Sequence, residues 1–283
     1  MKKKRIPLTA LGAVMFLAAA FTGFGQEPKP EEILERHVAA VGGRAKLDEI
    51  RNRIAAGTSE FESKLPKKKT TGKVLIASDK NNLMLMASFA SKEYPMERIG
   101  YFGNEVSLPW VSAGTRSPLG SYLADHGKVL SEGIFGGAIS SNSFLIDPSR
   151  TNGRLTGAGT KTVDGRKAYV LNYVAKGIGS QDFTIKLYFD AETFHHLRTE
   201  YRHEITPTTQ ERIGVMGLQS GVKLSLTETF GDFRSADGFT FPYDYKLIYR
   251  TDSNSGTYEY TWRVAVGAYN LNQNLAADFF KFQ

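Results

Sequence analysis

The chain has 283 residues, carries a formal net charge of +7 and contains no cysteine. Without cysteine it can form no disulfide framework and cannot carry a lipid attached through cysteine, so the core alone must stabilise the fold. Four of the basic residues and no acidic residue lie within residues 1–25, so the remainder carries only +3. With no basic block longer than residues 67–69, this small excess argues against a nucleic-acid partner.

The N-terminus is typical of a secretory signal peptide. Basic residues 2–5 precede an apolar run over residues 6–24. Small residues at −3 and −1 fit cleavage after Ala20 or after Gly25. A retained membrane anchor is the other reading, but the run is near the lower length limit for a bilayer span and contains threonine and glycine. We therefore predict that residues 1–25 are removed and that the rest is exported to the periplasm.

Two short helices are expected next, followed by strands. Residues 31–41 place apolar side chains on one helical stripe and end at a pair of glycines, and residues 45–51 form a second, shorter helix. From residue 54 the hydrophobic period changes to two, which predicts strands. The first four predicted strands are residues 54–62, 72–77, 83–89 and 96–101.

The second half of the chain has the pattern of an antiparallel meander. Asp164-Gly165 predicts a hairpin turn, and no strand–helix–strand rhythm or fixed-period repeat is present. The predicted strands are residues 156–163, 168–174, 183–189, 195–203, 222–230, 240–249 and 258–264. We predict a mainly β fold over residues 26–283: a large antiparallel sheet curled into an open half barrel and covered by two or three helices.

Residues 108–149 differ from the rest of the chain. They are rich in Gly, Ser and Pro, with one predicted helix near residues 119–130, and their large side chains Trp110, Phe135 and Phe144 belong to no clear strand. A long irregular segment in a compact domain is more often functional than accidental.

Several stretches resemble the LolA/LolB-like proteins, the outer-membrane lipoprotein-sorting or carrier family. The stretches are residues 33–43 with 50–57, 164–171, 187–194 with 198–201, and 230–234 with 237–242. The resemblance implies an open β barrel lidded by helices, whose apolar hollow takes acyl chains of lipoproteins or lipids. It also implies an arginine that latches the lid, for which Arg44, Arg51 and Arg53 are alternatives. No family motif maps onto residues 108–149.

Motifs for catalysis and cofactor binding are missing from the sequence. It contains no G-x-S-x-G, H-E-x-x-H, P-loop or G-x-G-x-x-G pattern, so we predict neither an enzyme nor a cofactor. His195 and His196 would point to opposite faces of a strand, which favours rim positions over a metal site. His126 is expected at a solvated helix end, and the glycine-rich residues 133–137 in a flexible loop. The row Tyr258, Tyr260 and Trp262 is more typical of a core than of a sugar or base site.

Two functional hypotheses remain. The first is a carrier that holds a lipid or a lipoprotein acyl chain in the hollow and passes it to a partner at the inner or outer membrane. The second is an envelope enzyme or assembly factor with its site in residues 108–149. For the carrier, the predicted cavity residues are Leu85, Trp110, Phe135, Phe144, Leu187, Phe189, Leu197, Leu226 and Leu247. In the plainer alternative, Trp110, Phe135 and Phe144 fill the hollow and leave an ordinary solid core.

Overall fold

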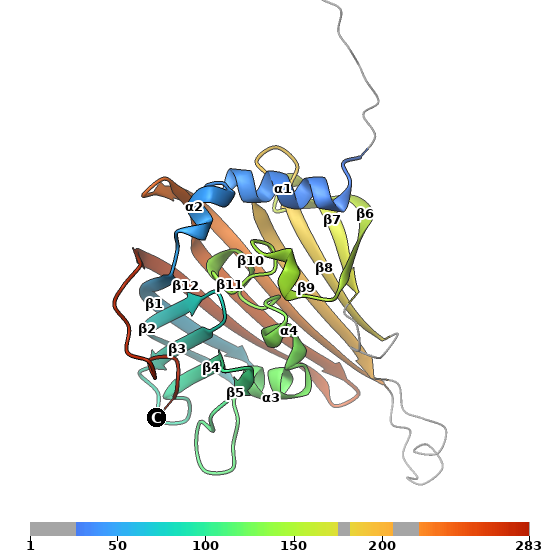
Figure 1. Cartoon of the computed structure of the whole chain (residues 1–283). Coiled ribbons are helices and arrows are strands. Elements are labelled where there is room, and N and C mark those ends of the chain that lie inside the picture. Colours follow the sequence, from blue (N-terminus) through green and yellow to red (C-terminus); the bar gives the residue numbers. More distant parts are fainter. Residues whose placement is uncertain (1–26, 175–181, 206–220, 283) are drawn as a thin grey trace, which may run out of the picture.

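The computed structural model describes residues 27–174, 182–205 and 221–282. The predicted signal peptide, residues 1–25, lies outside the described residues. The described part of the chain forms one twelve-stranded antiparallel sheet with four α-helices and two 3-10 helices (Figure 1). The sheet is not closed into a barrel, and the predicted mainly β architecture is confirmed.

The strands follow the predicted order but most are longer than predicted. Hairpin pairing continues past the alternating stretches, because backbone hydrogen bonds need no apolar side chain. The short edge strand β5 was not predicted, since its three residues carry no alternation signal. The strands are β1 (Asn52–Lys64), β2 (Lys67–Asp79), β3 (Leu83–Phe89), β4 (Met96–Phe102), β5 (Glu105–Ser107), β6 (Arg154–Val163), β7 (Arg166–Val174), β8 (Phe183–Asp190), β9 (His196–Ile205), β10 (Val222–Ala236), β11 (Phe239–Ser253) and β12 (Gly256–Leu271).

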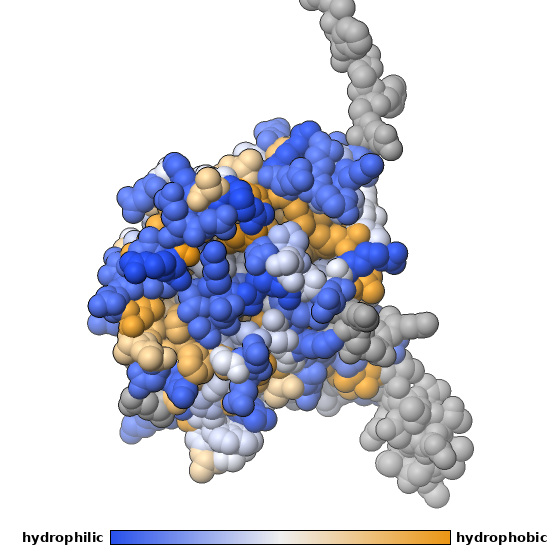
Figure 2. Space-filling model, viewed as in Figure 1, coloured by the Kyte–Doolittle hydropathy of each residue, from blue (hydrophilic) through white to orange (hydrophobic). Residues whose placement is uncertain are grey.

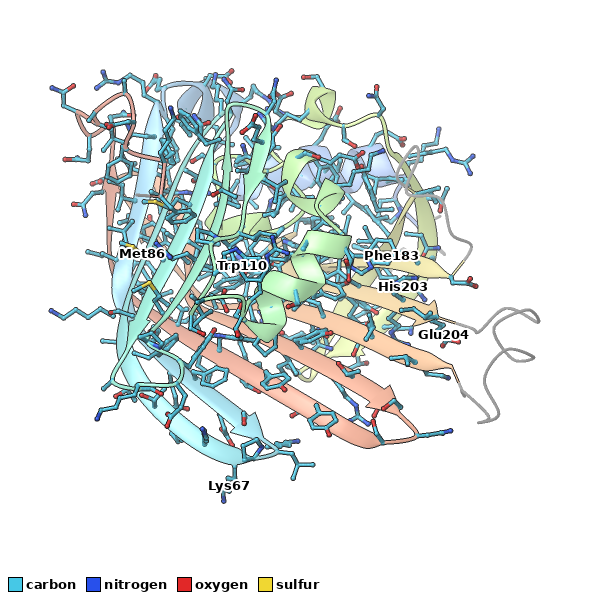
Figure 3. All side chains as sticks on the ribbon, turned by 90° about the horizontal axis from the view of Figure 1, so that it is seen from below. Lys67, Met86, Trp110, Phe183, His203 and Glu204 are labelled. Carbon is cyan, nitrogen blue, oxygen red and sulfur yellow. The ribbon has the colours of Figure 1, made fainter. Side chains whose placement is uncertain are left out.

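The strand order explains the position of the irregular middle of the chain. The order is β5-β4-β3-β2-β1-β12-β11-β10-β9-β8-β7-β6, so the first and last strands pair in the middle of the sheet. Strands β5 and β6 are consecutive in the chain yet form the two opposite edges. Residues 108–153, which we call the crossing segment, must therefore pass from one edge to the other across the inner face (Figure 1). Seen from below, the sheet curls around this segment (Figure 3).

The two predicted N-terminal helices are present and lie along one end of the sheet (Figure 1). The longer helix has proline and two glutamates in its first turn, and it buries Leu34 and Val38. No helix in the described part of the chain is long and apolar enough to cross a membrane. The helices are α1 (Pro30–Ala40), α2 (Arg44–Asp48), α3 (Pro118–Asp125) and α4 (Lys128–Ser131), with the 3-10 helices η1 (Gly137–Ile139) and η2 (Pro148–Arg150).

The single helix predicted near residues 119–130 is instead two helices, α3 and α4, with a break at His126 and Gly127. His126 has non-helical backbone angles, and its Nδ1 lies 2.8 Å from the carbonyl oxygen of Tyr122. The imidazole thus occupies an acceptor that a continuing helix would have used for a backbone N–H.

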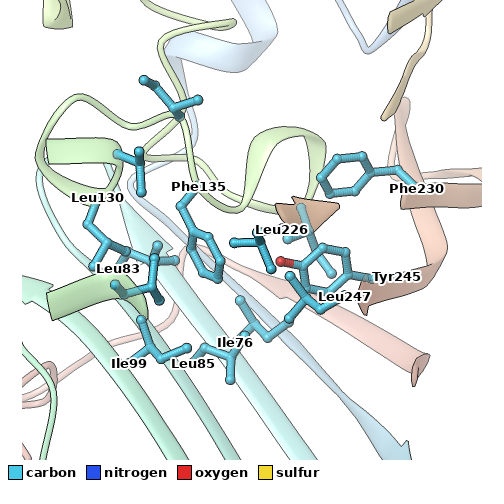
Figure 4. Packing of buried hydrophobic residues seen from close by; sticks show 14 of the residues in the cluster. Ile76, Leu83, Leu85, Ile99, Leu130, Phe135, Leu226, Phe230, Tyr245 and Leu247 are labelled. Atoms are coloured by element: carbon cyan, nitrogen blue, oxygen red, sulfur yellow. The ribbon is translucent and has the colours of Figure 1, made fainter. Parts of the chain in front are cut away.

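The inner face of the sheet and the crossing segment share one hydrophobic core (Figure 4). Strand residues such as Ile76 and Leu247 pack against crossing-segment residues such as Leu130 and Phe135. Gly133 is required here by close approach, since a Cβ on it would lie 2.1 Å from the carbonyl oxygen of Asn142. The expectation of a flexible loop at residues 133–137 is therefore wrong, because these glycines are packed within the core.

Smaller apolar clusters stabilise the outer face. One joins Val163, Ala168, Val170, Tyr188 and Leu197. Another seats Phe280, from the residues after β12, against Ala77 and Met84. Met86 on β3 also points outward and is 41% exposed (Figure 3).

Candidate functional site

Most residues predicted to line the hollow come together, but as a solid core. Seven of the nine share one buried cluster, each no more than 4% exposed. Five of them come from strands β3, β8, β10 and β11, and two come from the crossing segment. The seven are Leu85, Phe135, Phe144, Leu187, Phe189, Leu226 and Leu247. None of them lines any of the three pockets described below.

The other two predicted cavity residues lie elsewhere. Leu197 packs on the outer face, because one extra residue in β9 shifts its pairing with β8 between Tyr188 and Phe189. His196 takes the inward position in its place. Trp110 is 50% exposed, and its ring lies 4.4 Å from the guanidinium carbon of Arg116. The prediction that Leu197 and Trp110 face a common apolar interior is therefore wrong.

A buried carboxyl group holds the crossing segment against the sheet. Glu228 on β10 accepts hydrogen bonds from the hydroxyls of Tyr201 and Tyr245, both at 2.6 Å, and from the backbone N–H of Gly136 at 2.9 Å. Burial raises the pKa of Glu228 to about 7, while the three hydrogen bonds act in the lowering direction. Sequence reasoning missed this residue, although the alternation of β10 places it on the inward face beside Leu226 and Phe230.

A second buried carboxyl group repeats this arrangement nearer the opposite edge. Glu97 on β4 accepts a hydrogen bond from the hydroxyl of Ser117 at 2.7 Å and another from the hydroxyl of Tyr94. The Tyr94 oxygen in turn accepts from the indole N–H of Trp262 at 2.8 Å. Burial raises the pKa of Glu97 to about 7. The crossing segment is thus attached to the sheet at two buried polar points as well as through apolar contacts.

Three of the five histidines, His37, His126 and His196, are buried. His196 is fully buried among Phe189, Phe230 and His37, and burial lowers its pKa to about 3. His126 is 9% exposed, and its Nε2 lies 3.0 Å from Nδ1 of His203. The expected rim position for His196 and solvated position for His126 are both wrong. In the described ranges, no three His, Cys, Asp or Glu side chains gather in a way that could hold a metal ion.

The expected core position of the β12 aromatic row holds for two of its residues. Trp262 is buried in the main cluster and Tyr260 packs against it, whereas Tyr258 is 38% exposed. Phe61 of the core packs against this row, with its ring tilted against that of Trp262 and the two ring centroids 5.4 Å apart.

A pocket of about 440 Å³, which we call the end pocket, lies where β1 begins, between α2 and the last part of the crossing segment. Leu47 of α2 and Ile50, just after it, form one apolar wall, and Ile146 and Pro148 of the crossing segment form the other. Apolar surface is also visible in a band beneath the N-terminal helices, bordered by hydrophilic residues (Figure 2). The remaining lining residues are polar or charged: Arg44, Asp48, Arg53, Lys80, Ser141, Asp147, Ser149 and Arg150.

The three arginines proposed as latch alternatives have different environments. Arg44 of α2 donates a hydrogen bond to the carbonyl oxygen of Ile146, so it joins the helix to the crossing segment. Arg51 is exposed and donates to the carbonyl oxygen of Asn272 at 3.0 Å. Arg53 is only 2% exposed and lies with its guanidinium carbon 4.8 Å from the centre of the Phe241 ring. Arg53 is thus the one whose charge is buried at the wall of the end pocket.

Two further pockets differ in chemistry. One of about 510 Å³ lies at the other end of the sheet, where three lysines, Lys68, Lys69 and Lys92, surround the aromatic rings of Phe61 and Tyr260. The other, of about 270 Å³, is polar and lies beside the start of α1. The end pocket is the one of the three with both a buried charge and apolar walls from two elements.

No family model and no curated protein matches the chain, whereas solved structures do. A LolA-superfamily protein from Nitrosomonas europaea has 16% identity over 90% of this chain and 98% of its own, with a TM-score of 0.49. A domain assigned to outer-membrane lipoprotein sorting from Vibrio parahaemolyticus has 12% identity over 88% and 94%, with a TM-score of 0.45. A DUF1329-family protein from Desulfovibrio piger has 13% identity over 89% and 96%, with a TM-score of 0.39. The chain is thus similar in fold to LolA-superfamily and lipoprotein-sorting structures.

Proposed function

We propose that this chain is an exported, non-catalytic binding protein that holds the apolar part of a lipid or of a lipoprotein acyl chain in the end pocket. The observation that carries the proposal is the apolar lining of that pocket by Leu47, Ile50, Ile146 and Pro148. A volume of about 440 Å³ falls within the range of roughly 300–1,000 Å³ that is usual for small-ligand pockets. The basic and apolar N-terminus favours export to the periplasm, with residues 1–25 removed.

The position of the pocket also suits a carrier. One wall belongs to α2, which has only five residues, and the facing wall belongs to residues 146–150 of the crossing segment. Leu47, Ile50 and Ile146 belong to a small apolar cluster separate from the main core, so these walls can move apart while the main core stays packed, as entry and release of an acyl chain require. Release at the inner or outer membrane would pass the cargo to a delivery partner there.

The alternative, an envelope enzyme or assembly factor with its site in residues 108–149, has less support. The two buried carboxyl groups that meet this segment, Glu97 and Glu228, are already hydrogen-bonded within the core. Neither residue lines any of the three pockets. A catalytic acid or base must reach its substrate directly or through one water, so these groups are better suited to holding the segment in place.

Binding of an uncharged apolar fluorophore tests the proposal. Mature protein freed of bound lipid should enhance the fluorescence of N-phenyl-1-naphthylamine saturably at micromolar concentration. Ile146→Trp would fill the pocket mouth, where the side chain is partly exposed, and should reduce the binding at least several-fold. Met86→Trp is the matched control, because it adds the same bulk on the outer face of β3.

Two outcomes would contradict the proposal. If the wild-type protein shows no saturable binding of the fluorophore, the proposed carrier function is wrong. Equal binding by wild type and Ile146→Trp would mean that the apolar ligand occupies another place, such as the hollow after displacement of the crossing segment. Mass spectrometry of apolar material that copurifies with the native protein would identify the cargo.

A further inference from the structure

Within the described part of the chain, four buried hydrogen-bonding atoms of residues that line the end pocket have no partner. They are Nε and Nη2 of Arg53, Nε of Arg150 and Oγ of Ser141. Buried polar groups are almost always paired, because desolvation without a hydrogen bond is costly. The four atoms belong to residues of β1, of the middle of the crossing segment and of η2, and all three residues line one pocket. Their convergence indicates that a ligand supplies the missing acceptors.

The unpaired atoms of Arg53 have the geometry of an oxyanion site. Nε and Nη2 form one edge of the guanidinium plane, the edge that donates two parallel hydrogen bonds to a carboxylate or a phosphate. The plane is held by the Phe241 ring, 4.8 Å from the guanidinium carbon. An arginine fixed in this way loses little side-chain entropy when it binds, because its orientation is already set.

The net charge around the end pocket is positive, which also favours an anionic ligand. Burial lowers the pKa of Arg53 to about 10, and no carboxylate of the described residues lies within 4.0 Å of its guanidinium to offset the lost hydration. The two aspartates in the lining are occupied elsewhere. Asp48 pairs with Lys80 at 3.8 Å, and Asp147 accepts from the hydroxyl and the N–H of Ser149 at 2.6 and 3.1 Å. The positive charge of Arg53 therefore has no carboxylate partner among the described residues.

We propose that the end pocket recognises the anionic end of an amphiphile, a carboxylate or a phosphate group, through Arg53, Ser141 and Arg150. This rests on the proposed function, in which the apolar part of the ligand lies against the pocket's apolar side chains. The pocket then selects anionic lipids over neutral ones, because a neutral head group would leave the guanidinium edge desolvated and unpaired.

Comparison of a fatty acid with its own ester tests the proposal on the full mature chain. The fluorescent cis-parinaric acid and its methyl ester share one apolar chain and differ in the charge at its end. Wild-type protein should bind the acid about tenfold or more tightly than the ester, as expected for a charged hydrogen-bonded pair. Arg53→Gln should lower the affinity for the acid to that for the ester and leave the ester unchanged. Arg51→Gln, at the exposed arginine two residues earlier, should bind both probes like the wild type.

The outcomes separate this proposal from the proposed function. Equal affinity of the wild type for acid and ester would overturn anion recognition while leaving the carrier function intact. Binding of the acid that Arg53→Gln does not weaken would also overturn it. If Arg53→Gln fails to fold, the ratio of the affinities for acid and ester is compared between the wild type and Arg150→Gln. The same ratio in both proteins argues against the proposed anion site.

Competition distinguishes a lipid head group from a free anion. Lysophosphatidate should displace bound parinarate from the wild type, whereas inorganic phosphate at the same concentration should not. If inorganic phosphate displaces parinarate as effectively as lysophosphatidate does, the site binds a free anion, and the proposal that its ligand is an amphiphile is wrong. Failure of the uncharged fluorophore to bind, together with a rise in melting temperature with phosphate alone, would show that the carrier function fails while the anion site exists.

Discussion

Replacing Glu228 should weaken the attachment of the crossing segment more than any single apolar truncation. Glu228→Ala leaves the hydroxyls of Tyr201 and Tyr245 and the N–H of Gly136 without their shared acceptor in the core. At about 1–3 kcal/mol for each of the three unsatisfied buried groups, the expected loss of unfolding free energy is roughly 3–9 kcal/mol. Glu228→Gln keeps one acceptor oxygen and adds an amide that can donate to a tyrosine oxygen, so its cost should be far smaller.

The same carboxyl group should make stability depend on pH. Burial raises the pKa of Glu228 from its ordinary value of 4.5 to about 7, so between these values the folded protein binds a proton that the unfolded chain does not. Its contribution is complete below about pH 4.5 and is lost as the pH rises through about 7. At about 1.4 kcal/mol for each pH unit between the two pKa values, the loss is on the order of 3 kcal/mol. Glu97 acts in the same sense, since burial raises its pKa also to about 7.

Two buried histidines act in the opposite sense. Burial lowers the pKa of His37 to about 4 and that of His196 to about 3, from an ordinary value of 6.5. Their contribution is present above about pH 6.5 and is lost as the pH falls toward those lowered values. The effect of Glu228 is therefore measured as a difference between two proteins that share the histidines, not from the wild type alone.

Urea unfolding of wild type, Glu228→Gln and Glu228→Ala at about pH 5 and about pH 8 measures these quantities. The stability advantage of wild type over Glu228→Gln should shrink by about 3 kcal/mol between the two pH values, because only the wild type loses a buried proton. Glu228→Ala should be the least stable at both. If the difference in unfolding free energy between wild type and Glu228→Gln is the same at both pH values, the idea that folded Glu228 holds a proton is wrong. A Glu228→Ala variant as stable as the wild type would refute the anchoring role.

Two other predictions concern the helices and the sheet. Leu34 and Val38 of α1 are 7% and 6% exposed, so changing both to Asp should lower stability by several kcal/mol, and an unchanged melting temperature would place the helix on the surface. A Cβ on Gly72 would lie 1.6 Å from the carbonyl oxygen of Ser88, so Gly72→Ala should disturb the β2–β3 pairing and lower the melting temperature. Gly267→Ala, whose Cβ would be 3.6 Å from its nearest neighbour, is the control and should be tolerated.

Most of the strands and both N-terminal helices could be predicted from the sequence, because their signals are local. Alternation placed Leu187 and Phe189 correctly on one inner face, and helical spacing placed Leu34 and Val38 correctly beneath α1. Pairing across the sheet is not local. Nothing in either segment indicates that β12 lies beside β1, and the outward turn of Leu197 depends on an extra residue in β9 relative to β8.

The end pocket and the buried carboxyl groups were missed for a related reason. Arg53, Glu97 and Glu228 look like ordinary surface charges when each is judged by its residue type. Their positions in the period-two pattern carry the useful signal, since Glu97 and Ile99, like Glu228 and Leu226, share an inward face. A charged residue in phase with the apolar face of a strand therefore merits attention as a polar anchor or a ligand contact.

The filled hollow and the end pocket have one origin in the order of the strands. Because β5 and β6 are consecutive in the chain but lie at opposite edges, the connection between them has to cross the inner face. A crossing with polar side chains would bury unpaired groups, so its large apolar residues such as Phe135 and Phe144 fill the space. The same connection then passes α2 before it enters β6, and there Ser141 and residues 146–150 line the end pocket together with Arg53. Attachment of the crossing segment at Glu228 and the shape of the end pocket are thus properties of one continuous piece of chain.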